Sequence, residues 1–204
     1  VEHAKLALYF ADKPPARLLS GIQLPPAFGR FAGIDIPAGE SHFQIEDSIR
    51  LDVDVEAIAV FGHAHYICTE MEMTATLPDG QNMTLVKIDD WDLDWQDNYQ
   101  FASPISLPAG TVIHSRVAYD NSDANPENPY QPPQRIAWGR ESTDEMGSLT
   151  LTVVPKTAAD HDALRAQITS HRRESITKGI GQLFRRGAST QPIPKQLDRE
   201  SHAL

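Results

Sequence analysis

The chain has 204 residues and a formal net charge of −10 at pH 7, with 40% hydrophobic and 23% charged residues. This length suits one sizeable domain with an appendage, and the composition allows a buried core. The acidic excess disfavours nucleic acid as a partner because phosphates are repelled, and the absence of an apolar run near the ~18 residues of a membrane span excludes a transmembrane segment.

The N-terminal part begins at Val1 and enters a strand-like run, Leu6–Phe10, almost at once. It shows no basic start followed by an apolar stretch, so the sequence predicts no signal peptide. We expect that upstream sequence has been removed from this chain. A single cysteine, Cys68, excludes an intrachain disulfide.

Residues 1–155 are predicted to be all-β, because short β-branched or alternating runs are separated by turn signals rich in Pro and Gly. Pro78-Asp-Gly80 predicts a hairpin in which Gly80 takes positive φ. The Pro- and Asn-rich segment 121–133 is predicted to be an ordered surface loop. Many short antiparallel strands at this spacing favour a jelly-roll-like β-sandwich.

After Pro155 the pattern changes to that of a helix. Asp160 is a candidate cap for a helix from about His161 to Arg173, continuing toward Phe184. The sequence therefore predicts an antiparallel jelly-roll-like sandwich with a C-terminal helical extension. The expected parts are a copper-binding β-sandwich domain at 1–155, an amphipathic helical extension at 156–186 and an extended or disordered tail at 187–204.

The first pair of candidate metal ligands is His63-Ala-His65, at the end of the strand-like run Val55–Phe61. Residues i and i+2 of a strand point to the same face, with Cα atoms ~6.6 Å apart, so two imidazoles can converge on one ion. A chance pair on a half-buried strand gives the same pattern.

Met146 is the third candidate ligand, and it precedes another strand-like run, Leu149–Val154. A thioether is a soft ligand that favours copper, and Cu(I) in particular, over zinc or hard cations. The alternative is that Met146 only fills the core, which is the usual role of methionine. Because 81 positions separate Met146 from His65, spacing leaves the two alternatives open.

Seven short motifs follow one another in order: His63-Ala-His65, Leu77-Pro-Asp-Gly80, Asp90-Trp-Asp-Leu-Asp-Trp-Gln96, Tyr119-Asp-Asn-Ser122, Asn125-Pro-Glu-Asn-Pro129, Trp138-Gly139 and Thr143-Asp-Glu-Met146. Together they resemble the C-terminal domain of the copper type II, ascorbate-dependent monooxygenases. That family includes peptidylglycine α-hydroxylating monooxygenase and dopamine β-monooxygenase, and the likeness is closer to its bacterial members. The resemblance covers roughly residues 5–155.

The resemblance implies a jelly-roll-like domain in which His63, His65 and Met146 hold one copper that activates O2 and abstracts hydrogen from a small-molecule or peptide-like substrate. Ascorbate or another one-electron donor would supply electrons through a second copper, which three histidines of an N-terminal domain hold in this family. The resemblance also implies a periplasmic or secreted location. One departure is Gly147, where the animal enzymes often have a disulfide-forming cysteine.

No two of the other six histidines lie close together in the sequence. These are His3, His42, His114, His161, His171 and His202. We therefore expect the chain to lack the electron-storing copper domain and to be unable to complete the reaction alone.

The acidic run Asp90, Asp92 and Asp94 lacks the Gly and Glu that a calcium loop requires, because Trp95 and Phe101 stand there. Read as a strand, it would turn the carboxylates to one side and its tryptophans to the other. Cys68 and Tyr66 would face away from His63 and His65 if that strand stayed regular.

Three functions remain open from the sequence. The first is the oxygen-activating half of a copper monooxygenase. The second is a copper-binding module without turnover, which would need no partner domain. The third is a metal-free domain for carbohydrate or protein contact, with Trp91 and Trp95 as contact residues.

Overall fold

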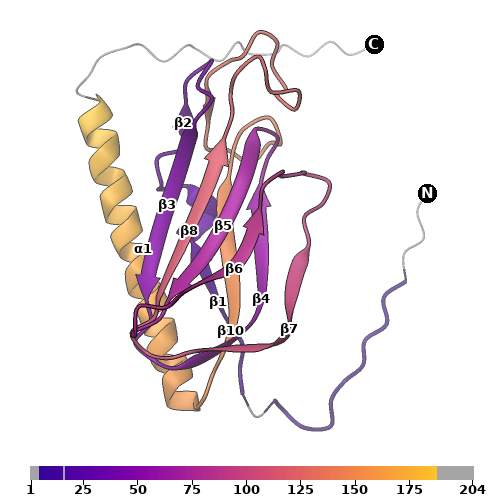
Figure 1. Ribbon diagram of the computed structural model, residues 1–204, viewed down its shortest axis with the longest axis vertical. Coiled ribbons are helices and arrows are strands. Elements are labelled where there is room, and N and C mark those ends of the chain that lie inside the picture. Colours follow the sequence, from indigo (N-terminus) through magenta and orange to yellow (C-terminus); the bar gives the residue numbers. More distant parts are fainter. Residues whose placement is uncertain (1–4, 16, 188–204) are drawn as a thin grey trace, which may run out of the picture.

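Two four-stranded antiparallel sheets pack face to face in the computed structural model, which describes residues 5–15 and 17–187 (Figure 1). One sheet has the strand order β1-β10-β4-β7, and the other has the order β3-β8-β5-β6. The strands are β1 (Ser20–Leu24), β3 (Phe43–Arg50), β4 (Val55–Ala64), β5 (Cys68–Thr76), β6 (Asn82–Ile88), β7 (Asn98–Leu107), β8 (Val112–Tyr119) and β10 (Gly147–Pro155). This arrangement confirms the predicted all-β sandwich with a helical extension.

The core lies between the two sheets and follows the period-2 alternation of the strands. On β8, Ile113, Ser115, Val117 and Tyr119 are buried, while the residues between them are partly exposed. The central strand β10 is buried on most of its length, because η1 (Pro26–Gly29) and the helix α1 (Ala158–Gly187) contact its outer side. A small ribbon of β2 (Asp35–Ile36) and β9 (Ile136–Ala137) lies beside the sandwich.

The predicted hairpin at Pro78-Asp-Gly80 is confirmed. It joins β5 to β6, and Gly80 has a φ of 88°, in the region that favours glycine. On β5, Met71 and Met73 are fully buried, whereas Glu70 and Glu72 lie on the outer face. The strand therefore has a solvated face beside a buried one, in step with its alternating sequence.

The helix α1 begins at Ala158, three residues before the predicted start. Its cap is Thr157 rather than Asp160: the Thr157 hydroxyl accepts from the Asp160 N–H at 3.1 Å, and the Asp160 carboxylate accepts from the Thr157 N–H at 3.1 Å. This is a reciprocal capping box, so Asp160 supports the cap from the first turn.

The helix α1 packs along the sandwich, beside β1, β10 and η1 (Figure 1). Leu164 is fully buried, and His171 Nε2 lies 2.8 Å from the carboxylate of Asp47 on β3. Gln167 bonds to the backbone of Arg50 and Asp52. The part of α1 around Leu164, Gln167 and His171 is therefore docked on the domain, whereas Ile180 is 44% exposed.

Two predicted strands are absent from the part of the chain that is described. Leu6–Phe10 is extended and exposed but pairs with no described strand. The acidic run 89–97 is a loop, because the Asp92 carboxylate accepts from the Asp94 N–H and the Asp92 carbonyl accepts from the Trp95 N–H, which closes a turn.

The loop at 121–133 is confirmed and is more buried than expected. Asn121, Asn125 and Asn128 are buried and hydrogen-bond to one another or to nearby backbone carbonyls. The predicted tail at 187–204 lies outside the described residues, except that Gly187 ends α1. None of the helices in the described ranges combines the length and apolar character that a bilayer span needs.

Candidate metal centre

The register of β4 and β10 brings the three predicted ligands together. Ser148 pairs with His63 and Gly147 pairs with Ala64, so Met146 arrives opposite the end of β4. One oxygen of Glu145, Oε1, accepts hydrogen bonds from the N–H of His65 at 2.7 Å and of Met146 at 2.8 Å. The pairing of β4 with β10 thus places Met146 and His65 at neighbouring strand ends, although 81 positions separate them in the sequence.

The two imidazole rings lie next to each other, with centroids 5.4 Å apart and planes perpendicular. Strand β4 ends at Ala64, and residues 65–67 form the turn into β5. The condition that the strand stays regular from His63 to Cys68 is therefore not met, although the two histidine rings still lie next to each other. Cys68 is buried in the core.

The ring of His63 is oriented by Gln96, whose Oε1 lies 2.7 Å from His63 Nδ1. The amide of Gln96 also donates from Nε2 to the carbonyl of Leu93 at 3.1 Å, which fixes Oε1 as the atom that faces the ring. Because Oε1 only accepts, His63 Nδ1 must carry the proton. Gln96 thus sets the tautomer of His63.

The ring of His65 is oriented in the same way by the backbone. Its Nδ1 lies 3.2 Å from the carbonyl oxygen of Asp144, which can only accept. Burial lowers the pKa of His65 below its ordinary value, although the Asp144 carbonyl opposes this effect. A lowered pKa favours the neutral imidazole, which is the form that binds metal.

In its neutral form each ring therefore carries its proton on Nδ1 and leaves the Nε2 lone pair as the possible metal donor. Metal-ligating histidines typically donate their other N–H to a carboxylate, amide or carbonyl, so the donor set fits a metal. No three His, Cys, Asp or Glu side chains gather into a metal cluster within the described ranges. The donors here are two imidazoles and a thioether, a set that fits copper.

The backbone beneath Met146 is fixed by Tyr119, whose hydroxyl donates to the Met146 carbonyl at 3.0 Å. A Cβ at Gly147 would overlap that hydroxyl, so only glycine fits there. Burial raises the pKa of the neighbouring Glu145 to about 8, and its Oε2 has no partner among described residues.

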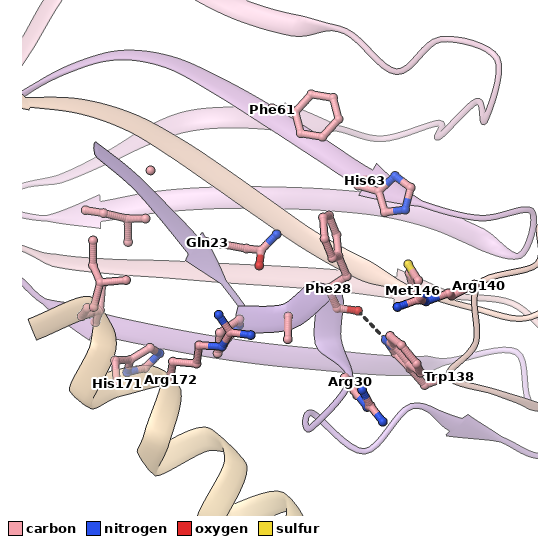
Figure 2. A pocket seen from close by; sticks show the side chains of 16 residues that line it. Gln23, Phe28, Arg30, Phe61, His63, Trp138, Arg140, Met146, His171 and Arg172 are labelled. Atoms are coloured by element: carbon pink, nitrogen blue, oxygen red, sulfur yellow. Dashed lines mark hydrogen bonds between the residues drawn. The ribbon is translucent and has the colours of Figure 1, made fainter. Parts of the chain in front are cut away.

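A cavity of about 810 Å³ opens beside His63 and Met146, and Figure 2 shows both side chains on its wall. Phe28 contacts His63 edge-on, with ring centroids 5.1 Å apart, and its carbonyl accepts from Trp138 Nε1 at 3.0 Å. Ala27 and Phe28 both have a φ of 54°, which is strained for residues with a Cβ. His65 is not part of the cavity wall.

The two tryptophans of the acidic loop differ in burial. Trp91 is buried and donates from Nε1 to the His65 carbonyl, whereas Trp95 is 67% exposed. They form no shared platform, so the predicted contact role of Trp91 is wrong. Sequence reasoning missed Gln96 as an orienting residue, because a hydrogen bond to a histidine 33 positions away leaves no local pattern.

No family model and no curated protein matches the chain. Among solved structures, the chain is similar to one described as the structure of infectious bursal disease virus Gx strain, with 9% identity and a TM-score of 0.30. A second is the structure of the Gt strain of that virus, with 10% identity and a TM-score of 0.29. Each match covers 75% of this chain and 42% of the other, so the chain spans less than half of either.

Proposed function

We propose that this chain is the oxygen-activating copper domain of a copper-dependent, ascorbate-type monooxygenase that hydroxylates a C–H bond. The observation that carries the proposal is the donor arrangement at the ends of β4 and β10. His63 and His65 each bond through Nδ1 to an acceptor-only oxygen, so Nε2 is the possible metal-binding nitrogen of each neutral ring. Met146 precedes Gly147, which pairs with Ala64 at the end of β4.

Each of the three residues has a defined role in this proposal. His63 Nε2 and His65 Nε2 supply two nitrogen donors, and the Met146 thioether supplies a soft sulfur donor that favours Cu(I). Copper held there would supply the one-electron chemistry that activates O2 for insertion into a C–H bond. Three protein donors leave a coordination position open, which such chemistry requires.

The surrounding residues keep the donors in place and limit access by water. Gln96 and the Asp144 carbonyl hold the two rings in the tautomer that can bind a metal. Phe28 covers one side of His63, and Phe28 and Trp138 both line the adjoining cavity, where a substrate would lie (Figure 2). The strained backbone at Phe28 is fixed by Trp138, which keeps this aromatic wall preorganised.

Copper binding to the full chain under reducing conditions tests the proposal, with X-ray absorption to identify the ligands. We expect one Cu(I) per chain with two nitrogens and one sulfur, loss of the sulfur in Met146→Leu and loss of a nitrogen in His63→Ala. Matched controls are Met83→Leu and His114→Ala, both on the opposite sheet. A folded chain that binds no Cu(I), or binds it equally in all variants, would overturn the proposal.

Turnover requires a second measurement, because a copper-binding module without activity would share the same ligands. The parent protein, assayed with ascorbate and O2, should lose hydroxylation in His63→Ala and keep it in His114→Ala. Intact turnover in His63→Ala would exclude this site as the centre of the reaction.

A further inference from the structure

The cavity beside His63 and Met146 has a positively charged lining in a protein that is acidic overall. Its sixteen lining residues include Arg30, Arg140 and Arg172, and none of them is Asp or Glu. The chain as a whole has 28 Asp and Glu against 18 Lys and Arg. The charge of this wall is therefore opposite to the average charge of the protein.

These three arginines have no carboxylate within ion-pair distance in the described part of the chain. Three other arginines of the domain do pair with acidic residues at 2.6–2.8 Å: Arg17 with Glu56, Arg116 with Glu70, and Arg135 with Asp35. Arg30 stacks over the ring of Trp138 at 5.0 Å, a contact that leaves its N–H groups available. Unpaired guanidinium groups at a concave wall are available to an anion from solution.

The arginines come from three separate elements that meet only in the folded chain. Arg30 follows η1, Arg140 precedes β10, and Arg172 lies on α1. In Figure 2, Arg140 appears at the end of the cavity that holds Met146, and Arg172 appears at the α1 end. His171 also lines the wall, but its Nε2 is hydrogen-bonded to the Asp47 carboxylate.

The rest of the lining is largely apolar. Phe28, Phe61 and Trp138 form its aromatic part, and Ile168 of α1 contributes an aliphatic part. The volume, about 810 Å³, is within the roughly 300–1,000 Å³ of small-molecule sites. A ligand that is complementary to this lining has both an apolar body and a negative charge.

We propose that the cavity binds a small carboxylate with an aromatic or branched apolar body, and that this is the substrate class of the adjoining site. The claim that this carboxylate is the substrate class rests on the proposed function. A guanidinium group binds a carboxylate through two parallel N–H···O bonds, which fixes the ligand's orientation. An apolar body against Phe28 and Phe61 then brings its C–H bonds beside His63 and Met146.

The test is isothermal titration calorimetry of the metal-free full chain with three probes of one shape: 3-phenylpropionate, 3-phenylpropanol and 3-phenylpropylammonium. Because a hydrogen bond to a charged group is stronger than a neutral one, we expect the carboxylate to bind at least roughly tenfold more tightly than the other two. Equal binding of the three probes, preference for the ammonium, or no binding of the carboxylate would overturn the proposal.

Variants locate the binding. Because Arg140 and Arg172 lie toward different ends of the cavity, at least one of Arg140→Gln and Arg172→Gln should weaken 3-phenylpropionate binding by roughly tenfold. The matched control Arg173→Gln, the next residue on α1 but not on the cavity wall, should leave it unchanged. Unchanged affinity in both cavity variants, or an equal loss in Arg173→Gln, would overturn the assignment. The titrations use the metal-free chain, so their outcome does not depend on copper binding. Failure of carboxylate binding would overturn only the ligand proposal, and failure of Cu(I) binding would overturn only the copper proposal.

Discussion

The indole N–H of Trp91 donates a hydrogen bond to the carbonyl oxygen of His65 at 3.1 Å. The backbone N–H of Trp91 also donates to the carbonyl of Thr69 at 3.0 Å, and the indole ring of Trp91 is buried. These contacts attach the acidic loop at 89–97 to the turn that carries His65. The same loop supplies Gln96 to His63, so a single loop supports both imidazoles.

Replacement of Trp91 should destabilise the fold. Trp91→Ala removes a buried ring and a hydrogen bond, so we expect a loss of about 3–5 kcal/mol in the free energy of unfolding, measured by urea denaturation. Trp95→Ala is the control, and because Trp95 is mostly exposed its effect should stay within about 0.5 kcal/mol. Similar losses in the two variants would contradict the different placement of these tryptophans.

Replacement of Gln96 should weaken copper binding without unfolding the chain. In Gln96→Leu the Nδ1 of His63 loses its acceptor, and the ring is free to change tautomer and orientation. Loss of such an orienting partner typically lowers metal affinity by about 10–100-fold, so a Cu(I) competition titration should show a change of that size. Gln100→Leu, at an exposed position on β7, should leave the affinity unchanged.

Replacement of Gly147 should show that the Tyr119 hydroxyl occupies the space of a side chain. Gly147→Ala places a Cβ against that hydroxyl, and overpacking of this kind typically destabilises a fold by about 1–3 kcal/mol. Adding Tyr119→Phe removes the clash, so the double variant should be more stable than the two single effects predict. Additive losses in thermal or urea unfolding would contradict this contact.

The stability of the metal-free chain should fall as pH rises, because of Glu145. Its pKa is about 8 when folded, against an ordinary value of 4.5. Between these values the unfolded chain releases this proton and the folded chain keeps it, so stability decreases by about 1.4 kcal/mol per pH unit and levels off above pH 8. Urea unfolding at pH 5 to 8 should show this slope.

A matched pair of variants separates the Glu145 effect from the titration of other groups. Glu145→Gln mimics the protonated side chain, so its unfolding free energy should vary less with pH than that of the natural chain. The exposed Glu141→Gln should keep the full pH dependence. The same slope in Glu145→Gln as in the natural chain would show that this carboxyl does not titrate as described.

Local patterns predicted much of the fold because they reflect interactions close in sequence. Pro78-Asp-Gly80 predicted the hairpin that joins β5 to β6. Alternation misled at residues 89–97, where hydrogen bonds accepted by Asp92 and the burial of Trp91 override strand propensity.

The sequence by itself determined which residue types the candidate site contains, since two imidazoles and a thioether, from His63, His65 and Met146, form a donor set that favours copper. Only the tertiary structure decided that they meet, because the pairing of β4 with β10 closes a separation of 81 positions. It also supplied Gln96, the Asp144 carbonyl and the cavity arginines, which come from distant elements. Long-range contacts of this kind depend on strand register and helix docking, and neither is encoded in any one segment of the chain.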